Sequence, residues 1–272
     1  MMRSLWTAAS GMKTQQTSLD TISNNLANIN TTGYKQERTE FQSLLYQTIQ
    51  EQTYDAEGHI KPIGAQVGLG VKVAAVSTEF SQGKITASTG AFDFAIQGDG
   101  LFMVQMPDGT TGYTRNGNFL MAVNGNGGVT LTTSDGYSVL DSEGNPITFD
   151  ADIDTMKLTF DNYGNIFYTN GDGTTENLGI RIGAAQFNNP SGLLKIGDSY
   201  FAESAASGTA RIEAQDAALS QSVIKHKYLE ASSVQAVDEM VDMIVTQRAY
   251  EMNSKAITAS DEMLQQANNL RS

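Results

Sequence analysis

The first thirty residues carry apolar side chains at alternating steps of three and four positions, with the polar Gln15 filling one place in the series. The apolar members are Leu5, Ala8, Met12, Leu19, Ile22, Leu26 and Ile29. This heptad spacing places them along one side of an α-helix and favours packing against another helix. Gly33 follows Thr31 and Thr32, and glycine at such a place is typical of a helix end. We predict an N-terminal helix over 1–32 with a helical partner.

A second long amphipathic segment lies at the C-terminal end of the chain. Its apolar positions at helical spacing include Val237, Val241, Ile244, Tyr250, Ile257 and Leu264. Ser232 and Gln235 have the spacing of a capping box, which predicts a helix start at that point. We expect 222–272 to contain a helix that pairs with 1–32 as a coiled-coil-like layer.

Between these ends the chain has little helical periodicity and many turn-forming pairs such as Asn116-Gly117 and Asp135-Gly136. They separate short runs rich in β-branched and aromatic residues, which are typical of strands. Leu101 to Met106 with Thr111 to Arg115 predicts one hairpin, and Lys157 to Phe160 with Ile166 to Thr169 predicts another.

The expected fold class is therefore α+β. A central antiparallel β domain, barrel-like or a sandwich, is predicted over 71–221, and turns and alternation do not choose between these two forms. The segment 33–70 has a few aromatic and apolar anchors and then a polar, glycine-containing stretch. It is predicted to be an extended connector that gains order from its neighbours.

Composition excludes several classes of function. The chain has 272 residues, no cysteine and a formal net charge of -13. That charge argues against nucleic acid and anionic membranes as partners. No apolar run reaches membrane-spanning length, so membrane insertion is not expected, and the residues after Met1-Met2-Arg3 are too mixed for a cleaved signal peptide.

An enzyme is the competing class, because the acidic centre offers carboxylates. Asp93, Asp99, Asp108 and Asp135 lie in turn-rich settings where an acceptor stabilises the turn without a catalytic role. Asp150, Asp152, Asp154 and Asp161 have the spacing of a calcium loop, but Thr155 occupies the place of its glycine and Asp161 that of its last glutamate. The two histidines, His59 and His226, are apart in the sequence. We predict no catalytic, cofactor-binding or metal site.

Runs at both ends and in the middle of the chain resemble those of bacterial flagellar rod and hook proteins. Near the N-terminus they are Arg3-Ser4-Leu5-Trp6, Gln15-Gln16, Leu19-Asp20, Ile22-Ser23-Asn24-Asn25-Leu26-Ala27-Asn28 and Thr32-Gly33-Tyr34-Lys35. Near the C-terminus they are Val237 to Met243 and Gln247-Arg248-Ala249-Tyr250-Glu251-Met252-Asn253-Ser254-Lys255. In the middle they are Asp93 to Phe102 and Tyr113 to Phe119. The run from Phe41 to Ile49 and the overall length are most similar to the subunits between the proximal rod and the hook.

The resemblance implies a structural subunit of the flagellar basal body, outside the cytoplasm. Such subunits polymerise into a hollow helical drive shaft, with paired terminal helices inside and the β domain outside. The implied partners are further copies of the chain, proximal rod proteins, hook protein, the flagellar type III export apparatus and, where the host has an outer membrane, surrounding ring proteins. The implied subunit contacts are Asn24, Asn25, Asn28, Gly33, Tyr34, Arg248, Glu251 and Asn253.

Energetics suggest that the terminal helices depend on assembly. Burying six large seam residues of 1–32 yields roughly 9 to 18 kcal/mol, whereas ordering about 25 residues costs at least as much. We therefore expect both termini to be largely disordered in a free monomer, with hydrogen-exchange protection confined to about 71–221. A paralogous rod or hook subunit and a secreted adhesin with a coiled-coil stalk remain as alternative functions.

Overall fold

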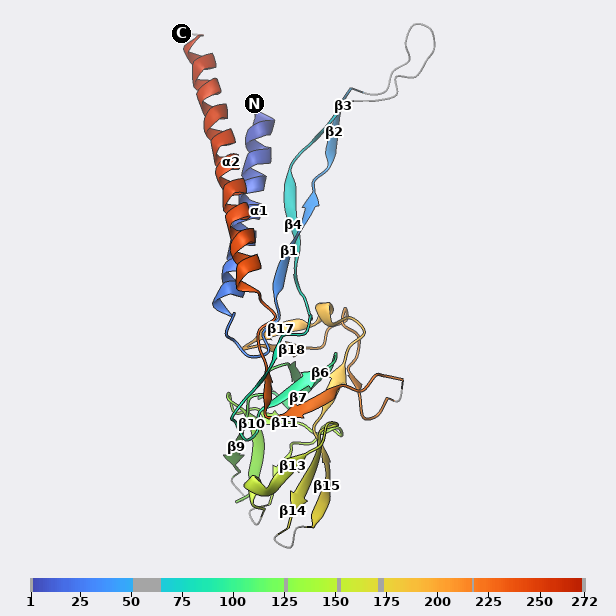
Figure 1. Cartoon of the computed structure of the whole chain (residues 1–272). Helices are drawn as coiled ribbons and strands as arrows, with labels where there is room; N and C mark the ends of the chain where they lie inside the picture. The colour runs from blue at the N-terminus through green and yellow to red at the C-terminus, as the bar shows by residue number, and fades with distance from the viewer. Residues whose placement is uncertain are drawn as a thin grey trace. The chain divides into compact units, whose positions relative to one another are not determined.

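The computed structural model describes residues 2–50, 65–124, 127–150, 153–170, 174–216 and 218–270. Over these residues the fold is α+β, with one long helix at each end and β strands between them, as the sequence predicted (Figure 1). The chain divides into two units. The helical unit comprises Met1–Ala27, Glu37–Thr78 and Gln235–Ser272, and the β unit comprises Asn28–Gln36 and Glu79–Val234.

The helical unit contains both long helices and four strands. These are α1 (Met2–Ala27), α2 (Ala236–Asn269), β1 (Glu37–Ser43), β2 (Tyr46–Gln50), β3 (Ala65–Gly68) and β4 (Val71–Thr78). β1 pairs antiparallel with β4, and β2 pairs antiparallel with β3. The segment predicted as an extended connector thus contains strands, apart from 51–64, which lie outside the described residues. The pairing joins segments distant in sequence, such as Glu37 with Thr78, and no local pattern indicates it.

Each helix is shorter than predicted at the end from which the chain continues into the β unit. α1 ends at Ala27, and turns continue to Gly33. α2 begins only at Ala236, because 223–230 forms two strands of the β unit. Gln235 occupies the N-cap position without a side-chain hydrogen bond, so the expected capping box is not formed.

The largest sheet of the β unit has ten strands. They are β7 (Leu101–Gln105), β8 (Thr111–Thr114), β9 (Phe119–Val123), β10 (Val129–Thr133), β11 (Ser138–Val139), β12 (Thr148–Phe149), β16 (Ala184–Gln186), β17 (Leu194–Gly197), β18 (Tyr200–Ala202) and β19 (Arg211–Ile212). The order is β12-β10-β11-β7-β8-β18-β17, with β9 beside β10 and with β16 joining β7 to β19. The sheet is open, with β12 and β17 at its ends, so its strands do not close into a barrel.

Smaller sheets complete the β unit. They consist of β13 (Leu158–Phe160), β14 (Asn165–Thr169) and β15 (Thr175–Arg181), of β6 (Phe94–Gln97) with β20 (Val223–His226), and of β5 (Ile85–Ala87) with β21 (Tyr228–Glu230). Two single turns of 3-10 helix lie at Thr155–Lys157 and Pro190–Gly192. Both predicted hairpins are confirmed, as the pairs β7–β8 and β13–β14.

The core of the β unit lies on both faces of β7. Phe102 and Val104 belong to one buried apolar cluster, and Leu101 and Met103 to a second. Alternate side chains of a strand point to opposite faces, so this continuous apolar run is what a strand covered on both sides requires. The β unit therefore has its own hydrophobic core, separate from the helices.

Candidate assembly surface

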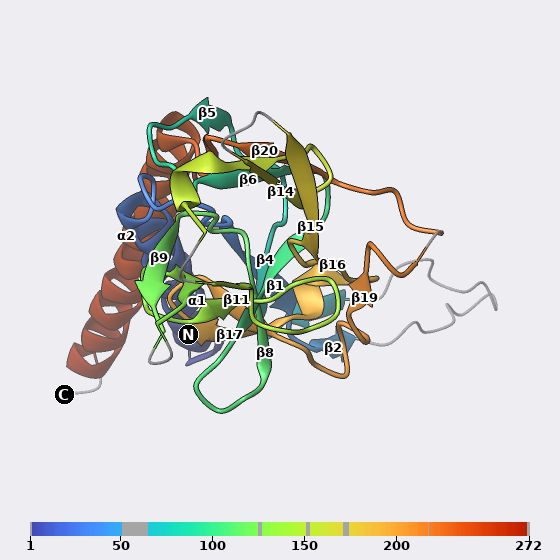
Figure 2. The same ribbon diagram turned by 90° about the horizontal axis from the view of Figure 1, so that it is seen from below.

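In the helical unit α1 and α2 lie side by side and antiparallel (Figure 1, Figure 2). The hydroxyls of Ser4 and Ser260 are 3.4 Å apart, and the Asn25 amide lies 3.1 Å from the Glu239 carboxylate. Gly11 faces Asn253 between these two contacts. Ser4, Gly11 and Asn25 are separated by one and two heptads, as are their partners on α2, so the register is constant along the pair.

The buried side of α1 consists mainly of small and polar residues. Its buried members are Ala8, Gly11, Thr14, Thr21, Ile22 and Asn25. A β-carbon on Gly11 would lie 2.8 Å from the side-chain nitrogen of Asn253, which shows how closely the helices approach. Of the large residues in the predicted seam, Ile22 is buried, whereas Leu5, Met12, Leu19 and Leu26 in α1 and Ile29 beyond it are half-buried.

The least exposed residues of α2 form one series at steps of three and four, which we name the inner face. It comprises Glu239, Met243, Thr246, Ala249, Asn253, Ile257, Ser260 and Leu264. Its buried members are Glu239, Thr246 and Ser260, so the most buried positions of this face are polar. The predicted seam residues Ile257 and Leu264 lie on it and are half-buried.

Opposite the inner face, at 3.6 residues per turn, α2 exposes a row of large apolar side chains. This outer face comprises Val237, Met240, Val241, Ile244, Val245 and Met252. Val237 is 73% exposed and Ile244 59% exposed. The predicted seam of α2 is therefore divided between two sides of the helix, with Val237, Val241 and Ile244 directed away from the inner face. Tyr250 is 37% exposed, at the margin between the two.

Asn25 is a structural residue inside the helical unit and is only 1% exposed. Its amide nitrogen donates to the Glu37 carbonyl at 2.8 Å and to the Glu239 carboxylate at 3.1 Å. Its amide oxygen accepts the Glu37 backbone N–H at 2.9 Å. The expectation that Asn25 faces a neighbouring subunit does not fit this burial, because its hydrogen bonds join α1, β1 and α2 of the same chain.

Gly33 also has a role within the chain. Its φ of +69° lies in the left-handed region, and a β-carbon there would lie 2.6 Å from the backbone of Arg115. A buried position of this kind offers no side chain to another subunit. Nearby, Tyr34 is half-buried, and its carbonyl accepts the Ser233 N–H at 3.1 Å.

Of the remaining predicted contact residues, Asn253 lies on the inner face against Gly11, and the others are more accessible. Asn24 is exposed on α1, whereas Asn28 is half-buried and accepts a hydrogen bond from the Thr31 hydroxyl at 3.0 Å. Arg248 and Glu251 form an ion pair at a spacing of three residues, at 2.9 Å on the surface of α2. Together with the outer face, these residues are the ones available for contacts beyond the chain.

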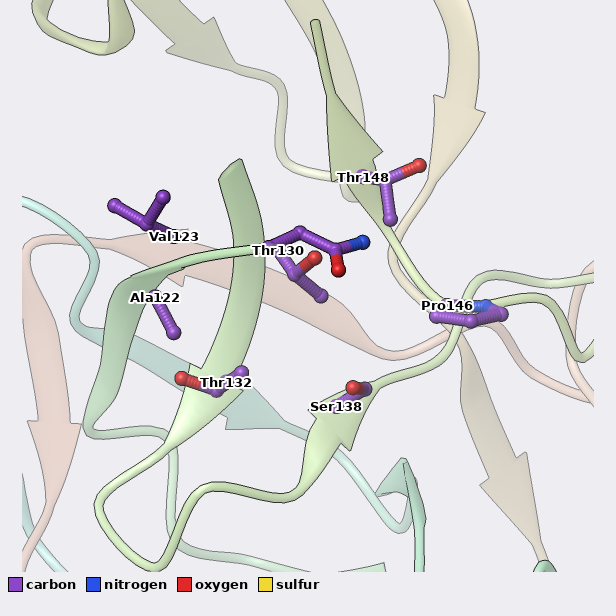
Figure 3. Close-up of a pocket in the computed structure, with 8 residues that line it drawn as sticks. Ala122, Val123, Thr130, Thr132, Ser138, Pro146 and Thr148 are labelled. Carbon is purple, nitrogen blue, oxygen red and sulfur yellow. The ribbon is translucent and has the colours of Figure 1, made fainter. Parts of the chain in front are cut away.

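A shallow pocket of about 240 Å³ lies on β9, β10, β11 and β12 of the β unit. Figure 3 shows Thr148 and Pro146 on one side of it and Ala122 and Val123 on the other. Its lining has hydroxyl and amide groups but no carboxylate, imidazole or amine, so it lacks a general acid or base. Among the described residues, no three potential ligands gather in a way that could hold a metal ion. No helix in the described ranges is long and apolar enough to cross a membrane.

Three of the aspartates considered as enzyme candidates make hydrogen bonds that stabilise the fold. Asp93 is buried and accepts a hydrogen bond from Ser88, and Asp135 accepts one from the Tyr200 hydroxyl at 2.7 Å. Asp154 caps the 3-10 turn that follows it, where its carboxylate accepts the Met156 N–H. Asp152 of the rejected calcium spacing lies outside the described residues.

One buried cluster was missed by sequence reasoning. Lys35 and Arg115 both approach Glu230, at 2.7 and 3.3 Å, and all three side chains are almost fully buried. Burial, and next the charge of Arg115, lowers the pKa of Lys35, although Glu230 acts in the opposite direction. Burial also lowers the pKa of Arg115. The three residues of the cluster are far apart in the sequence, so no local pattern joins them. The one signal in the sequence is that each of them is a charged residue.

Three family models match the chain. Residues 5–35 match the model described as flagella basal body rod protein, and residues 95–168 match the flagellar hook protein FlgE/F/G D1 domain. Residues 225–270 match the C-terminal model of the flagellar basal body rod FlgEFG proteins. The three matches cover both helices and part of the β unit.

Relatives that match over the whole chain are also flagellar basal-body proteins by name. The chain is 44% identical to the flagellar basal-body rod protein FlgG of Borreliella burgdorferi, over 100% of this chain and 99% of that protein. It is 42% identical to FlgG of Caulobacter vibrioides over the whole of both chains. The flagellar hook-basal body complex protein FlhP of Bacillus subtilis is 31% identical, also over the whole of both.

Proposed function

We propose, because this chain belongs to the flagellar basal-body rod protein family, that it is a structural subunit of the flagellar rod. In this proposal it occupies the distal part of the rod, polymerises into a hollow helical shaft, transmits torque from motor to hook and leaves a channel for export. Identity is 44% and 42% to the two FlgG proteins and 31% to FlhP, which favours the rod assignment over a paralogous hook-complex role.

The outer face of α2 is the observation that supports polymerisation. An exposed, contiguous row of large apolar side chains on a helix is typical of an interaction surface. Trp6 of α1 is also 70% exposed. Since the β unit has its own core, these side chains are not required for its folding. They are therefore available for contacts with further copies of the chain.

In the assembled rod, α1 and α2 pair as a coiled-coil-like inner layer. Their constant register over three heptads supports this. The predicted seam then acts in two parts: Ile22, Ile257 and Leu264 support the pair within the subunit, while Val237, Val241 and Ile244 bind its neighbours. Leu5, Met12, Leu19 and Leu26 are half-buried at the margins of the pair and can contribute to either.

The partners follow from the position in the basal body. They are further copies of the chain, proximal rod proteins on one side and hook protein on the other, with ring proteins around the rod where the host has an outer membrane. The chain reaches this place through the flagellar type III export apparatus. Asn24, Arg248 and Glu251 are the accessible family-motif residues proposed to bind neighbouring subunits. No catalytic activity and no cofactor are part of the proposal.

Electron microscopy of the concentrated, purified chain tests the proposal. Hollow tubes of constant diameter are expected, and the same chain should restore motility to a flagellate strain that lacks its own distal rod subunit. Short stalked heads would indicate an adhesin instead. Monomers at all concentrations, together with no restoration of motility, would refute a rod subunit.

A further inference from the structure

Within the β unit, two short segments lie against each other. One is 28–36, which follows α1 in the chain, and the other is 230–234, which leads towards α2. The Gly33 N–H donates to the Glu230 carbonyl at 2.8 Å, and the Ser233 N–H donates to the Tyr34 carbonyl at 3.1 Å. The Gln36 N–H donates to the Ser233 hydroxyl at 2.9 Å. Two backbone–backbone hydrogen bonds, at Gly33 and Tyr34, thus join the segments before Lys35, and a bond from the Gln36 N–H to the Ser233 side chain joins them after it.

Charged side chains reinforce this junction. Lys35 Nζ lies 2.7 Å from Glu230 Oε1 and donates to the Ser81 carbonyl at 2.7 Å. The Gly83 N–H donates to the same carboxylate oxygen at 2.8 Å. Arg115 lies 3.3 Å from the other oxygen of Glu230. We name Lys35, Arg115 and Glu230 the ionic clamp.

The charges of the clamp are balanced from within the β unit. Two cations share Glu230, and the charges of Asp99 and, next, of the buried Glu213 also favour the charged form of Arg115. Glu213 is 2% exposed and is held by the Ser222 N–H and hydroxyl and by the Gln186 amide. Because a buried charge that loses its partner is strongly unfavourable, the clamp opens only at a high free-energy cost.

We propose that Lys35, Arg115 and Glu230 are positioning residues for assembly: the ionic clamp holds the segments that continue into α1 and α2 side by side, whether or not the helices are formed. Five residues lie between Ala27 and Gly33, and five lie between Glu230 and Ala236. The two helices are thus tethered by equally short connections. The consequence for assembly depends on the proposed rod function, whereas the holding of the segments does not.

The helix pair has a need for such a device. Its interface is formed largely by small and polar residues such as Ala8, Gly11 and Thr14, which discriminate poorly between registers one heptad apart. A slip by one heptad would move one helix about 10 Å along the other. Two short tethers starting from adjacent points disfavour such a slip, so the clamp supports the register that places Asn25 beside Glu239.

Hydrogen exchange on the full-length monomer tests the holding of the segments. Because 28–36 and 230–234 belong to the β unit, we expect protection there too, beyond the bounds of 71–221 that the sequence predicted. In Glu230→Gln the amides of Gly33, Gln36 and Ser233 should exchange faster by on the order of a hundredfold, relative to the Leu131 amide in the β core, which donates to Ile147. Asp93→Asn is the matched control, since it removes the charge of a buried carboxylate of the β unit that binds Ser88 and neither segment. There the three amides should change only in step with Leu131. Unchanged protection in Glu230→Gln, or equal loosening in both variants, would overturn the clamp.

Lys35→Met provides a milder variant if Glu230→Gln does not fold, because it leaves Glu230 paired with Arg115. The amides of Gly33 and Ser233 should again exchange faster than Leu131. In polymerisation assays both clamp variants should need at least about tenfold more protein than Asp93→Asn to form tubes. Equal assembly despite loosened segments would refute the positioning role. Failure of the unmodified chain to form tubes would refute the rod function instead, and hydrogen exchange would still decide the clamp.

Discussion

Ile244→Asp provides the most direct test of the outer face. Ile244 is 59% exposed in the subunit, so the substitution removes few contacts within the chain, and exposed substitutions usually change stability by less than about 0.5 kcal/mol. Burying the exposed part of the side chain in an assembly contributes about 1 to 2 kcal/mol. An unpaired carboxylate buried in its place costs about 3 to 5 kcal/mol more. Together these effects raise the critical concentration for polymerisation by at least about a thousandfold.

The measurement is the protein concentration at which tubes first form, by sedimentation and electron microscopy, with circular dichroism as a check on folding. Leu120→Asp is the matched control, because Leu120 is a similarly sized apolar residue, 53% exposed, on the β unit. It should assemble within about tenfold of the unmodified chain. A critical concentration of Ile244→Asp within the same range would show that the outer face is not an assembly contact. Equal loss of assembly in the control would show that the effect is not specific to α2.

Three further outcomes are expected from particular side chains. Gly11→Leu should separate α1 from α2 and destabilise the helical unit by about 1 to 3 kcal/mol, because the new side chain meets Asn253. Gly11→Ala should cost less, because its β-carbon displaces only the flexible amide end of Asn253. The measurement for both is denaturant titration followed by the helical circular dichroism signal. Asn25→Leu should lower the stability of the helical unit by about 2 kcal/mol or more through unpaired buried groups, without moving the unfolding of the β unit. Burial, and next the hydrogen bond to Glu203, raises the pKa of Tyr113, so the folded state binds its proton more tightly than the unfolded chain. The free energy of unfolding of the β unit should then fall as the pH rises above about 10. Tyr113→Phe should reduce this dependence on pH in denaturation measured from about pH 8 to 11. An unchanged pH dependence in the variant would contradict the raised pKa of Tyr113.

The features that were predicted from the sequence are those encoded locally. A long run of helical periodicity gave both terminal helices, and Pro107-Asp108-Gly109 between two apolar runs gave the β7–β8 hairpin. The pairing of β1 with β4 was missed, because it joins segments separated by residues 44–70 and because Phe41 is the one large apolar side chain of β1.

The division of α2 into two faces was missed for a different reason. Hydrophobic periodicity assumes that the buried side of a helix is the apolar side. In α2 the buried residues include Glu239, Thr246 and Ser260, while Val237 and Ile244 are exposed. The polar inner face is defined by close approach and by hydrogen bonds such as that from Asn25 to Glu239, and neither is visible in a pattern of apolar residues. The ionic clamp was missed because Lys35 and Arg115 were considered only as members of family-like runs and of a hairpin, and Glu230 was not considered.

The arrangement of polar and apolar faces in α2 links folding to assembly. A small, polar inner face supplies little hydrophobic free energy, so the α1–α2 pair alone barely offsets the conformational entropy of ordering two long helices. The large exposed apolar side chains of α2 lie on the outer face, where they contribute hydrophobic free energy only when another molecule covers them. The β unit has the opposite arrangement, with Phe102 and Leu131 fully buried in its own core. A subunit built in this way gains most of its helical stability from its neighbours, which favours growth at the end of an existing polymer over association of free monomers.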